Sequence, residues 1–230
     1  MQQPIIIIAT PHPRNRHLAS DVRKGLPDYK IIHIKSRNEL TVEIIEKYKP
    51  DFIFFPHWSW KIPEEIYARY NCVIFHMTDL PYGRGGSPLQ NLIIRGHQNT
   101  MMSALKCNAE MDAGPVYLKE PLSLDGSAED ILLRASILIK EIIIQIVREK
   151  IEPQPQYGKV VEFKRRTHED GNLAKLTELN QVYDFIRMLD GEGYPPAFLR
   201  NGSLMYEFTQ VKKTNETVEA KVIIRAKEHE

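Results

Sequence analysis

The chain has 230 residues, 42% of them hydrophobic, and a formal net charge of +1 at pH 7. This size suits one sizeable domain, or one main domain with a small appendage. A nearly neutral chain gives no electrostatic case for nucleic acid or for an anionic membrane as the main partner, so the sequence predicts neither.

Two further features point to a cytoplasmic protein. The only cysteines, Cys72 and Cys107, lie in apolar segments and are expected to be core residues in a reducing compartment. The first eight residues lack the cationic region of a signal peptide, and no apolar run is long enough to cross a bilayer.

Short apolar runs alternate with helical periodicity through the first half of the chain. The candidate strands are dense in Ile, Val or Phe and cover Ile5–Ala9, Lys30–Ile34, Phe52–Phe55 and Val73–Phe75. Helices are predicted between them, at about Arg14–Lys24, Val42–Lys49 and Pro63–Tyr70. This alternation indicates the α/β class, with a Rossmann-like, mostly parallel sheet and helices on both faces.

The most informative segment follows, from His76 to Gln90. It leaves a buried strand, passes through a Gly- and Pro-rich loop, and reaches a helix start at Ser87 and Pro88. Open α/β sheets bind ligands at the carboxyl ends of their strands. His12 and His57 also follow candidate strands, so three histidines are expected at one edge of the sheet, although His12 and His57, each taken singly, are better explained as polar residues where a strand meets water.

Asp112 gives the second signal. It precedes a small-Gly-Pro turn, where an aspartate commonly just bonds nearby backbone amides. In the same crevice as a histidine, it would complete an acid–base pair.

The rest of the chain predicts two more strands, a long helix and a small appendage. The strands lie near Met101–Cys107 and Val116–Leu118, and the helix covers Ala128–Lys150 with a capping box at Ser127 and Asp130. After a Pro-rich connector come a helix near Glu178–Leu189, a hairpin turn at Asn201–Gly202 and a strand near Val218–Ala226. We therefore expect a main α/β domain over residues 1–152 and a small α+β subdomain over residues 153–230.

The segment from His76 to Gln90 resembles the signature of the folate-dependent formyltransferases, which use 10-formyltetrahydrofolate. The matching positions are His76, Leu80, Pro81, Arg84, Gly85 and Pro88. The segment 111–116 is similar to the family's Asp-x-Gly-x segment, and 186–189 with 194–198 is similar to its C-terminal pattern. The resemblance covers most of the chain.

This resemblance implies an N-formyltransferase that takes 10-formyltetrahydrofolate as co-substrate and uses no metal. An acceptor amine would attack the formyl carbon, His76 would stabilise the oxyanion, and Asp112 would orient His76 and help to remove the amine proton. The folate-binding positions would be His57, Leu80, Pro81, Gly83, Arg84, Gly85, Asn108 and Met111.

One position departs from the family pattern. The family has a catalytic asparagine two residues before the histidine, where this chain has Ile74, and strand alternation puts position 74 on the same face as His76. We expect Asn91 or Gln90 to substitute, and take Asn91 as the third catalytic residue, unless His76 and backbone N–H groups suffice. Asn91 is also readily explained as a residue on the surface of a helix.

This variant of the signature is most similar to a branch of sugar N-formyltransferases, including those near pseudaminic acid pathways. The expected acceptor is therefore a nucleotide-linked amino sugar, and a homodimer is compatible with the sequence. Methionyl-tRNA formyltransferases are disfavoured because they hold a polyanion with a longer C-terminal domain. An aminoacyl or peptide-synthetase-bound amine as acceptor, a hydrolase that releases formate, and a folate-binding module without activity stay open as alternatives.

Overall fold

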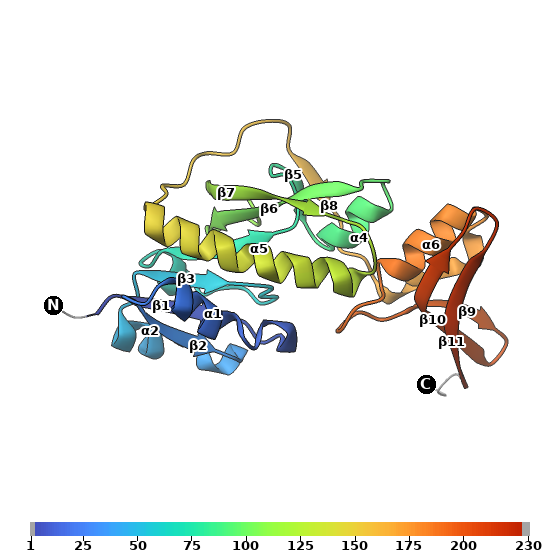
Figure 1. Cartoon of the computed structure of the whole chain (residues 1–230), viewed down its shortest axis with the longest axis horizontal. Coiled ribbons are helices and arrows are strands. Elements are labelled where there is room, and N and C mark those ends of the chain that lie inside the picture. The colour runs from blue at the N-terminus through green and yellow to red at the C-terminus, as the bar shows by residue number, and fades with distance from the viewer. Residues whose placement is uncertain (1–2, 227–230) are drawn as a thin grey trace. The chain divides into compact units, whose positions relative to one another are not determined.

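The computed structural model describes residues 3–226 (Figure 1). The first half of the chain forms β1 (Ile5–Ala9), α1 (Leu18–Gly25), β2 (Lys30–Ile34), α2 (Val42–Tyr48), β3 (Phe52–Phe55), α3 (Glu64–Tyr67), β4 (Cys72–His76), β5 (Tyr82–Gly85), α4 (Pro88–Ile93) and β6 (Asn99–Lys106). The second half forms β7 (Val116–Ser123), α5 (Ala128–Glu149), β8 (Val161–Phe163), α6 (Leu179–Arg187), β9 (Ala197–Asn201), β10 (Leu204–Lys213) and β11 (Val218–Ala226).

A six-stranded sheet of order β2-β1-β3-β4-β6-β7 forms the centre of the fold. Its first four strands pair in parallel, and β6 runs antiparallel to β4. All five residues of β1 are buried, as expected for a strand covered on both faces. The predicted α/β class with a mostly parallel sheet is therefore confirmed.

Alternation along the strands separates two cores. On one face, Ile7 and Phe55 pack with Ile45 of α2 and Ile66 of α3. Residues in between, such as Ile6 and Ile8, point to the opposite face. Helices α1 and α5 pack closely, because a Cβ at Gly25 would lie 2.4 Å from the Cδ1 atom of Ile144.

The chain divides into two compact units that are interleaved along the sequence. The first comprises residues 1–84, 101–122 and 133–162, and the second comprises 85–100, 123–132 and 163–230. The predicted boundary after residue 152 stays a prediction, since the unit that contains 163–230 also takes in two earlier segments.

The second unit contains a three-stranded antiparallel sheet of order β11-β10-β9, with α6 packed on β10. Its hairpin pairs Asn201 with Leu204, and Gly202 in the turn has the positive φ (+57°) that glycine adopts without strain. Arg187 at the end of α6 is buried and donates from Nη1 to the carbonyls of Leu124 (2.6 Å) and Gly126 (3.0 Å), and from Nε to Asp184 (2.7 Å).

Most predicted elements are confirmed, and the differences have local causes. The predicted helix at Arg14–Lys24 begins as a short 3-10 turn at Pro13–Asn15, and α1 starts only at Leu18. Two strands were not predicted, β5 and β8, which pair with each other. Both are too short, at four and three residues, for a period-2 pattern to identify them, and each is defined by its pairing with a distant segment. No helix within residues 3–226 is long and apolar enough to cross a membrane.

Candidate functional site

His76 is the last residue of β4, at the edge where the parallel strands end. It lies opposite Ser103 of β6 and is only 7% exposed. Its ring Nε2 lies 2.7 Å from the carbonyl oxygen of Gly83. A carbonyl oxygen only accepts hydrogen bonds, so Nε2 carries a hydrogen, and Nδ1 is left to share a proton with another group.

That other group is Asp112. Its Oδ2 lies 3.5 Å from Nδ1 of His76, and both side chains are nearly buried, at 12% and 8% exposure. At this distance the two side chains form an acid–base pair when a proton lies between them, whereas without it two acceptors would face each other. The predicted pairing of a histidine with Asp112 is thus present in the structure.

The backbone around Asp112 is held in an unusual conformation. Asp112 has a positive φ of 53°, a region that Asp and Asn tolerate better than most residues. Two residues on, a Cβ at Gly114 would lie 1.8 Å from the carbonyl oxygen of Lys106, so only glycine fits there. This close approach fixes the direction from which Asp112 reaches His76.

Gln156 holds the same loop and was missed by the sequence reasoning. Its side-chain amide donates to the carbonyls of Asp112 and Gly114, at 2.8 Å each. Its Oε1 accepts from Nη2 (2.8 Å) and Nε (3.2 Å) of Arg84. A glutamine in a Pro-rich connector carries no motif, and only the three-dimensional structure reveals that it links the two loops.

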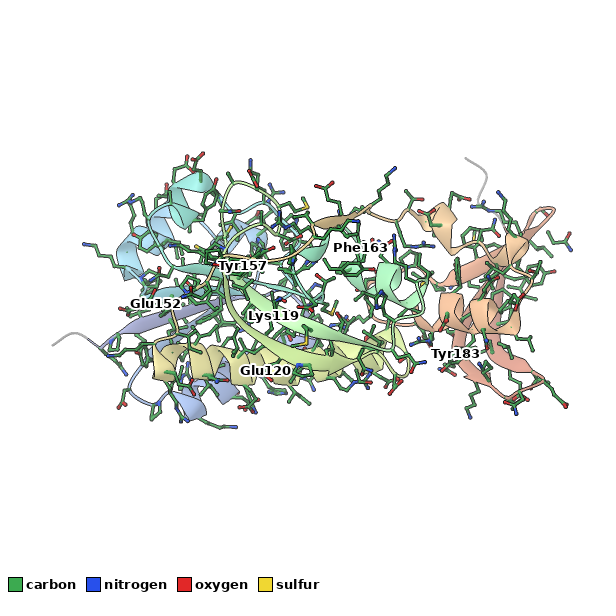
Figure 2. All side chains as sticks on the ribbon, turned by 90° about the horizontal axis from the view of Figure 1, so that it is seen from above. Lys119, Glu120, Glu152, Tyr157, Phe163 and Tyr183 are labelled. Carbon is green, nitrogen blue, oxygen red and sulfur yellow. The ribbon has the colours of Figure 1, made fainter. Side chains whose placement is uncertain are left out.

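The loop after β4 is fixed by buried polar contacts. Thr78 and Ser103 are fully buried, and the Ser103 hydroxyl donates to the carbonyl of Thr78 at 2.7 Å. Lys119 of β7, labelled in Figure 2, donates from Nζ to Asp79 (2.6 Å) and to the carbonyl of Leu80 (2.5 Å). Residues 78–80 of the loop are therefore attached to the neighbouring strands β6 and β7.

Five of the predicted folate-binding residues fall into two groups, one buried and one exposed. Leu80, Pro81 and Gly83 are buried, and the Leu80–Pro81 peptide bond is cis. Asn108 and Met111 are exposed, Met111 by 73%. The first group therefore packs within the protein, while the exposed pair offers surface on the loop that carries Asp112.

His12 and His57 reach the same sheet edge as His76, as expected from the sequence. They follow β1 and β3, and β3 lies between β1 and β4. Their ring centroids are 6.0 Å apart with the rings nearly perpendicular. Burial, together with the charges of His12 and Arg14, lowers the pKa of His57 to about 3, so this ring is neutral at physiological pH.

Asn91 and Gly85 belong to the second unit. Asn91 is buried, its amide donates to the carbonyls of Gly86 (3.0 Å), Ser87 (3.1 Å) and Lys164 (2.9 Å), and its Oδ1 accepts from Arg95 (2.8 Å). A Cβ at Gly85 would lie 2.6 Å from the carbonyl oxygen of Phe163, a residue labelled in Figure 2. The contacts of both residues serve the packing of their own unit, and the catalytic role predicted for Asn91 stays a prediction.

Ile74, where the family pattern has asparagine, packs against the core formed with α2 and α3. It lies opposite Phe55 of β3 and Leu105 of β6. At position 74 the apolar side chain is therefore explained by its packing in the core. Among residues 3–226 no group of three or more His, Cys, Asp or Glu is arranged to hold a metal ion.

One of the matches to known proteins covers nearly the whole of both chains. A solved structure described as methionyl-tRNA formyltransferase from Clostridium thermocellum has a TM-score of 0.93 and 43% sequence identity, covering 97% of this chain and 99% of that one. Residues 168–225 match the family model described as the C-terminal domain of methionyl-tRNA formyltransferase. The small C-terminal appendage is thus similar to a domain of that enzyme family.

Two further comparisons give the range of similarity. A methionyl-tRNA formyltransferase of Thermodesulfovibrio yellowstonii is 23% identical over 161 residues, and the chain spans about half the length of that relative (52%). The structure of a sugar N-formyltransferase from Shewanella sp. has a TM-score of 0.69 at 14% identity, covering 87% of this chain and 94% of that one. At this level of identity, the likeness to the sugar enzyme shows the fold alone.

These findings correct two expectations. The predicted acceptor, a nucleotide-linked amino sugar, is wrong, because the match at 43% identity is a methionyl-tRNA formyltransferase. The prediction that no nucleic acid takes part is wrong for the same reason. It was based on the net charge of the whole chain, which says nothing about local clusters of basic residues.

Proposed function

The chain belongs to the formyltransferase family that includes the methionyl-tRNA formyltransferases, and from this we propose that it transfers a formyl group from 10-formyltetrahydrofolate to the amino group of methionyl-tRNA. The donor predicted from the sequence is the one this family uses. The observation that carries the proposal is the pair of His76 and Asp112 at the carboxyl edge of the central sheet. The chain that forms this pair matches a methionyl-tRNA formyltransferase over 97% of its length.

The residues around this pair suit a folate donor. Met111 exposes 73% of its surface beside Asp112, and Asn108 presents an exposed amide on the same loop. An apolar side chain that covers a flat ring, with a few polar groups that fix its orientation, is the usual composition of a cofactor site.

The proposed reaction needs no covalent intermediate on the protein. The lone pair of the amine attacks the formyl carbon, and the electrons of the carbonyl bond move to its oxygen. Asp112 as a carboxylate accepts the proton that the amine loses, and returns a proton to the folate nitrogen that leaves. The products are the N-formylated acceptor and tetrahydrofolate.

His76 would stabilise the oxyanion through the charge of its ring. When both ring nitrogens carry hydrogens, one N–H faces the Gly83 carbonyl and the other faces Asp112. Both N–H groups are therefore committed, and the positive charge next to the reacting centre supplies the stabilisation. Because His76 is nearly buried, water screens this charge little.

The direct test is a formylation assay with 10-formyltetrahydrofolate and methionyl-tRNA. The amino acid is then hydrolysed from the tRNA, and mass spectrometry shows whether it carries one added formyl group. We expect formylmethionine, with methionyl-tRNA preferred over free methionine. Formate release without any acceptor would identify a hydrolase instead, and folate binding without turnover would identify a binding module. Either of these two results would refute the proposed transfer.

A further inference from the structure

The two cysteines of the chain lie directly opposite each other on neighbouring strands. β4 and β6 are antiparallel, with Val73 of β4 opposite Lys106 of β6, and this register places Cys72 opposite Cys107. The backbone N–H of Cys107 donates to the carbonyl of Cys72 at 2.8 Å, as expected for such a pair. Opposite residues joined in this way have Cα atoms about 5.5 Å apart, inside the range of about 4.4–6.8 Å that disulfides span. The backbone therefore permits a bond between the two sulfur atoms.

The two side chains also share one face of the sheet. Opposite residues of an antiparallel pair point to the same side, with Cβ atoms about 4.5–5.5 Å apart. Cys72 is fully buried and Cys107 is partly buried, and both pack in the core formed with α2 and α3. Both thiols are free. A Cβ separation of about 3.8 Å suits a disulfide, so a shift of about 1 Å at Cys107 allows the bond to form.

Cys107 leads directly into the loop that carries Asp112. Lys106, the last residue of β6, is bonded to the far end of this loop, because its N–H donates to the carbonyl of Pro115 at 2.9 Å. The carbonyl of Lys106 is also the atom against which Gly114 packs. The charge of Asp112 acts on the thiol of Cys107, which places the two side chains near each other. A movement of Cys107 into the core therefore disturbs both ends of the loop, and with them Asp112.

Accessibility and protonation set the order and the speed in which the two thiols react. Cys107 is the more accessible of the two, so it reacts first with an oxidant from solution. Burial, together with the charge of Asp112, raises the pKa of Cys107 to about 11, and burial also raises the pKa of Cys72. Because the thiolate is the reactive form, both thiols exchange slowly at neutral pH. The pair therefore suits a response to lasting oxidising conditions rather than to brief ones.

We propose that Cys72 and Cys107 form a reversible disulfide, which lowers formyl transfer by displacing the loop of Asp112. The oxidant is a small disulfide such as oxidised glutathione. The Cys107 thiolate attacks one of its sulfur atoms and releases a first glutathione thiolate, and the Cys72 thiolate then attacks the sulfur of Cys107 and releases the second. The two protein thiols lose two electrons, which reduce oxidised glutathione to two glutathione molecules, and these take up the two protons. In a reducing compartment such bonds are transient and act as redox sensors.

Mass spectrometry and kinetics of the full-length protein test the bond and its effect. We would incubate the protein with oxidised glutathione at about pH 8.5, where more thiolate is present, and digest a sample without reduction. We expect a fall in mass of about 2 Da, for the two hydrogens lost, and a peptide that joins Cys72 to Cys107. The kcat for formyl transfer should fall at least about tenfold, because a displaced Asp112 accepts the amine proton poorly. Dithiothreitol should restore both the mass and kcat.

The two single variants are matched controls. Cys107→Ser should retain the kcat of the reduced wild type, and oxidised glutathione should change neither its mass nor its activity, because the remaining thiol is buried. Cys72→Ala should stop after the first step, with one glutathione bound to Cys107. Inactivation of Cys107→Ser as fast as the wild type would contradict the proposal.

The effect on formyl transfer rests on the proposed function, so a second readout needs no turnover. Amide hydrogen exchange in residues 108–114 should be faster in the oxidised wild type than in the reduced protein. A disulfide between two chains, glutathione that stays on wild-type Cys107, or a closed bond with unchanged exchange or unchanged kcat would each overturn the proposal. If the bond forms and exchange rises, but the reduced protein does not formylate methionyl-tRNA, the proposed function alone fails.

Discussion

The positions of the His76 and Asp112 side chains are fixed by the residues around them. The ring of His76 is fixed through Nε2 by the Gly83 carbonyl, and Asp112 is fixed by a positive φ and by a glycine that admits no side chain. Preorganised charge of this kind needs no rearrangement when the transition state forms. The residue pair is therefore the part of the molecule where substitutions should act on the rate alone.

The first prediction concerns this pair. His76→Ala should reduce kcat for formyl transfer by at least about a hundredfold, because the charge beside the oxyanion is lost. Asp112→Asn should cost about a hundredfold as well, because an amide accepts no proton, while asparagine tolerates the positive φ and preserves the loop. Steady-state kinetics with both substrates would measure this, and unfolding curves should match those of the wild type. Retention of more than a few per cent of activity in His76→Ala would disprove the assignment.

The second prediction concerns pH. His57 has a pKa of about 3 in the folded protein and about 6.5 when unfolded. The unfolded chain thus binds one more proton between these values, so the stability that neutral His57 contributes is complete above pH 6.5 and is lost as the pH falls toward 3. In His57→Asn, which suits the positive φ, the free energy of unfolding should decline less steeply over this range, by at most about 1.4 kcal/mol per pH unit.

Urea denaturation at several pH values measures this difference. His17→Asn, at an exposed position, is the matched control and should follow the wild-type profile. If the free energy of unfolding changes with pH in the same way in His57→Asn and in the wild type, folding does not lower the pKa of His57, and this prediction is wrong.

At the scale of elements, the site is assembled from loops that a single side chain connects. Gln156 lies in the connector between α5 and β8 and bonds the loop after β6 as well as Arg84 of β5. Three segments distant in sequence therefore share one amide group. A loop held in this way has little freedom to move Asp112 away from His76.

The third prediction tests Gln156 as a positioning residue. Gln156→Leu removes every bond of the amide, and Gln156→Glu keeps an acceptor for Arg84 but loses the two donors to the Asp112 loop. Both should lower kcat about tenfold to a hundredfold, because small misplacements of a catalytic group are costly. The KM for the acceptor should stay within about threefold. Gln154→Leu, in the same connector but exposed, should behave as the wild type. If Gln156→Glu retains full kcat, the donors to the loop are unimportant.

At the scale of the whole molecule, the second unit is held together across long sequence separations. Arg187 bonds the carbonyls of Leu124 and Gly126, and the amide of Gln90 donates to the carbonyl of Met188 at 3.2 Å. Residues 163–230 thus form one compact unit together with the earlier segments 85–100 and 123–132. The similarity of 186–189 to a family pattern is explained here by folding rather than by catalysis.

The fourth prediction follows from this. Arg187→Met keeps most of the side-chain volume but leaves two carbonyls without their donor, so we expect a loss of about 3 kcal/mol in the free energy of unfolding. Arg200→Met breaks an exposed ion pair with Glu169 and should cost less than about 1 kcal/mol. Urea denaturation would compare the two. An equal, small effect of both would show that Arg187 is dispensable for folding.

Much of the fold could be predicted because buried strands and helices have recognisable patterns of apolar residues in the sequence. β1, β2, β3 and β11 lie where the apolar runs predicted them. The capping box of α5 is present, with the backbone N–H of Ser127 donating to the Asp130 carboxylate (2.9 Å) and the backbone N–H of Asp130 donating to the Ser127 hydroxyl (3.2 Å). β5 and β8 were missed because they are only four and three residues long and are defined by their pairing with each other. Local patterns report the burial of longer segments, whereas the pairing of two short, distant segments gives no such pattern.

The candidate site divides in the same way. The pairing of His76 with Asp112 was predicted from motifs, but Gln156 was not, because its function lies in bonds to backbone carbonyls that carry no sequence signal. The acceptor was predicted wrongly because the prediction used the resemblance of the signature to sugar N-formyltransferases and the short C-terminal appendage. Neither of these features describes the surface that binds the acceptor.

The interleaving of the two units also bears on how such a protein can change over generations. The chain passes from one unit to the other after residues 84, 100, 122, 132 and 162. A gene fusion or crossover at any single junction would therefore transplant neither unit intact. New acceptors would have to arise by point substitution and loop exchange within one inherited framework, rather than by the recruitment of a ready-made module.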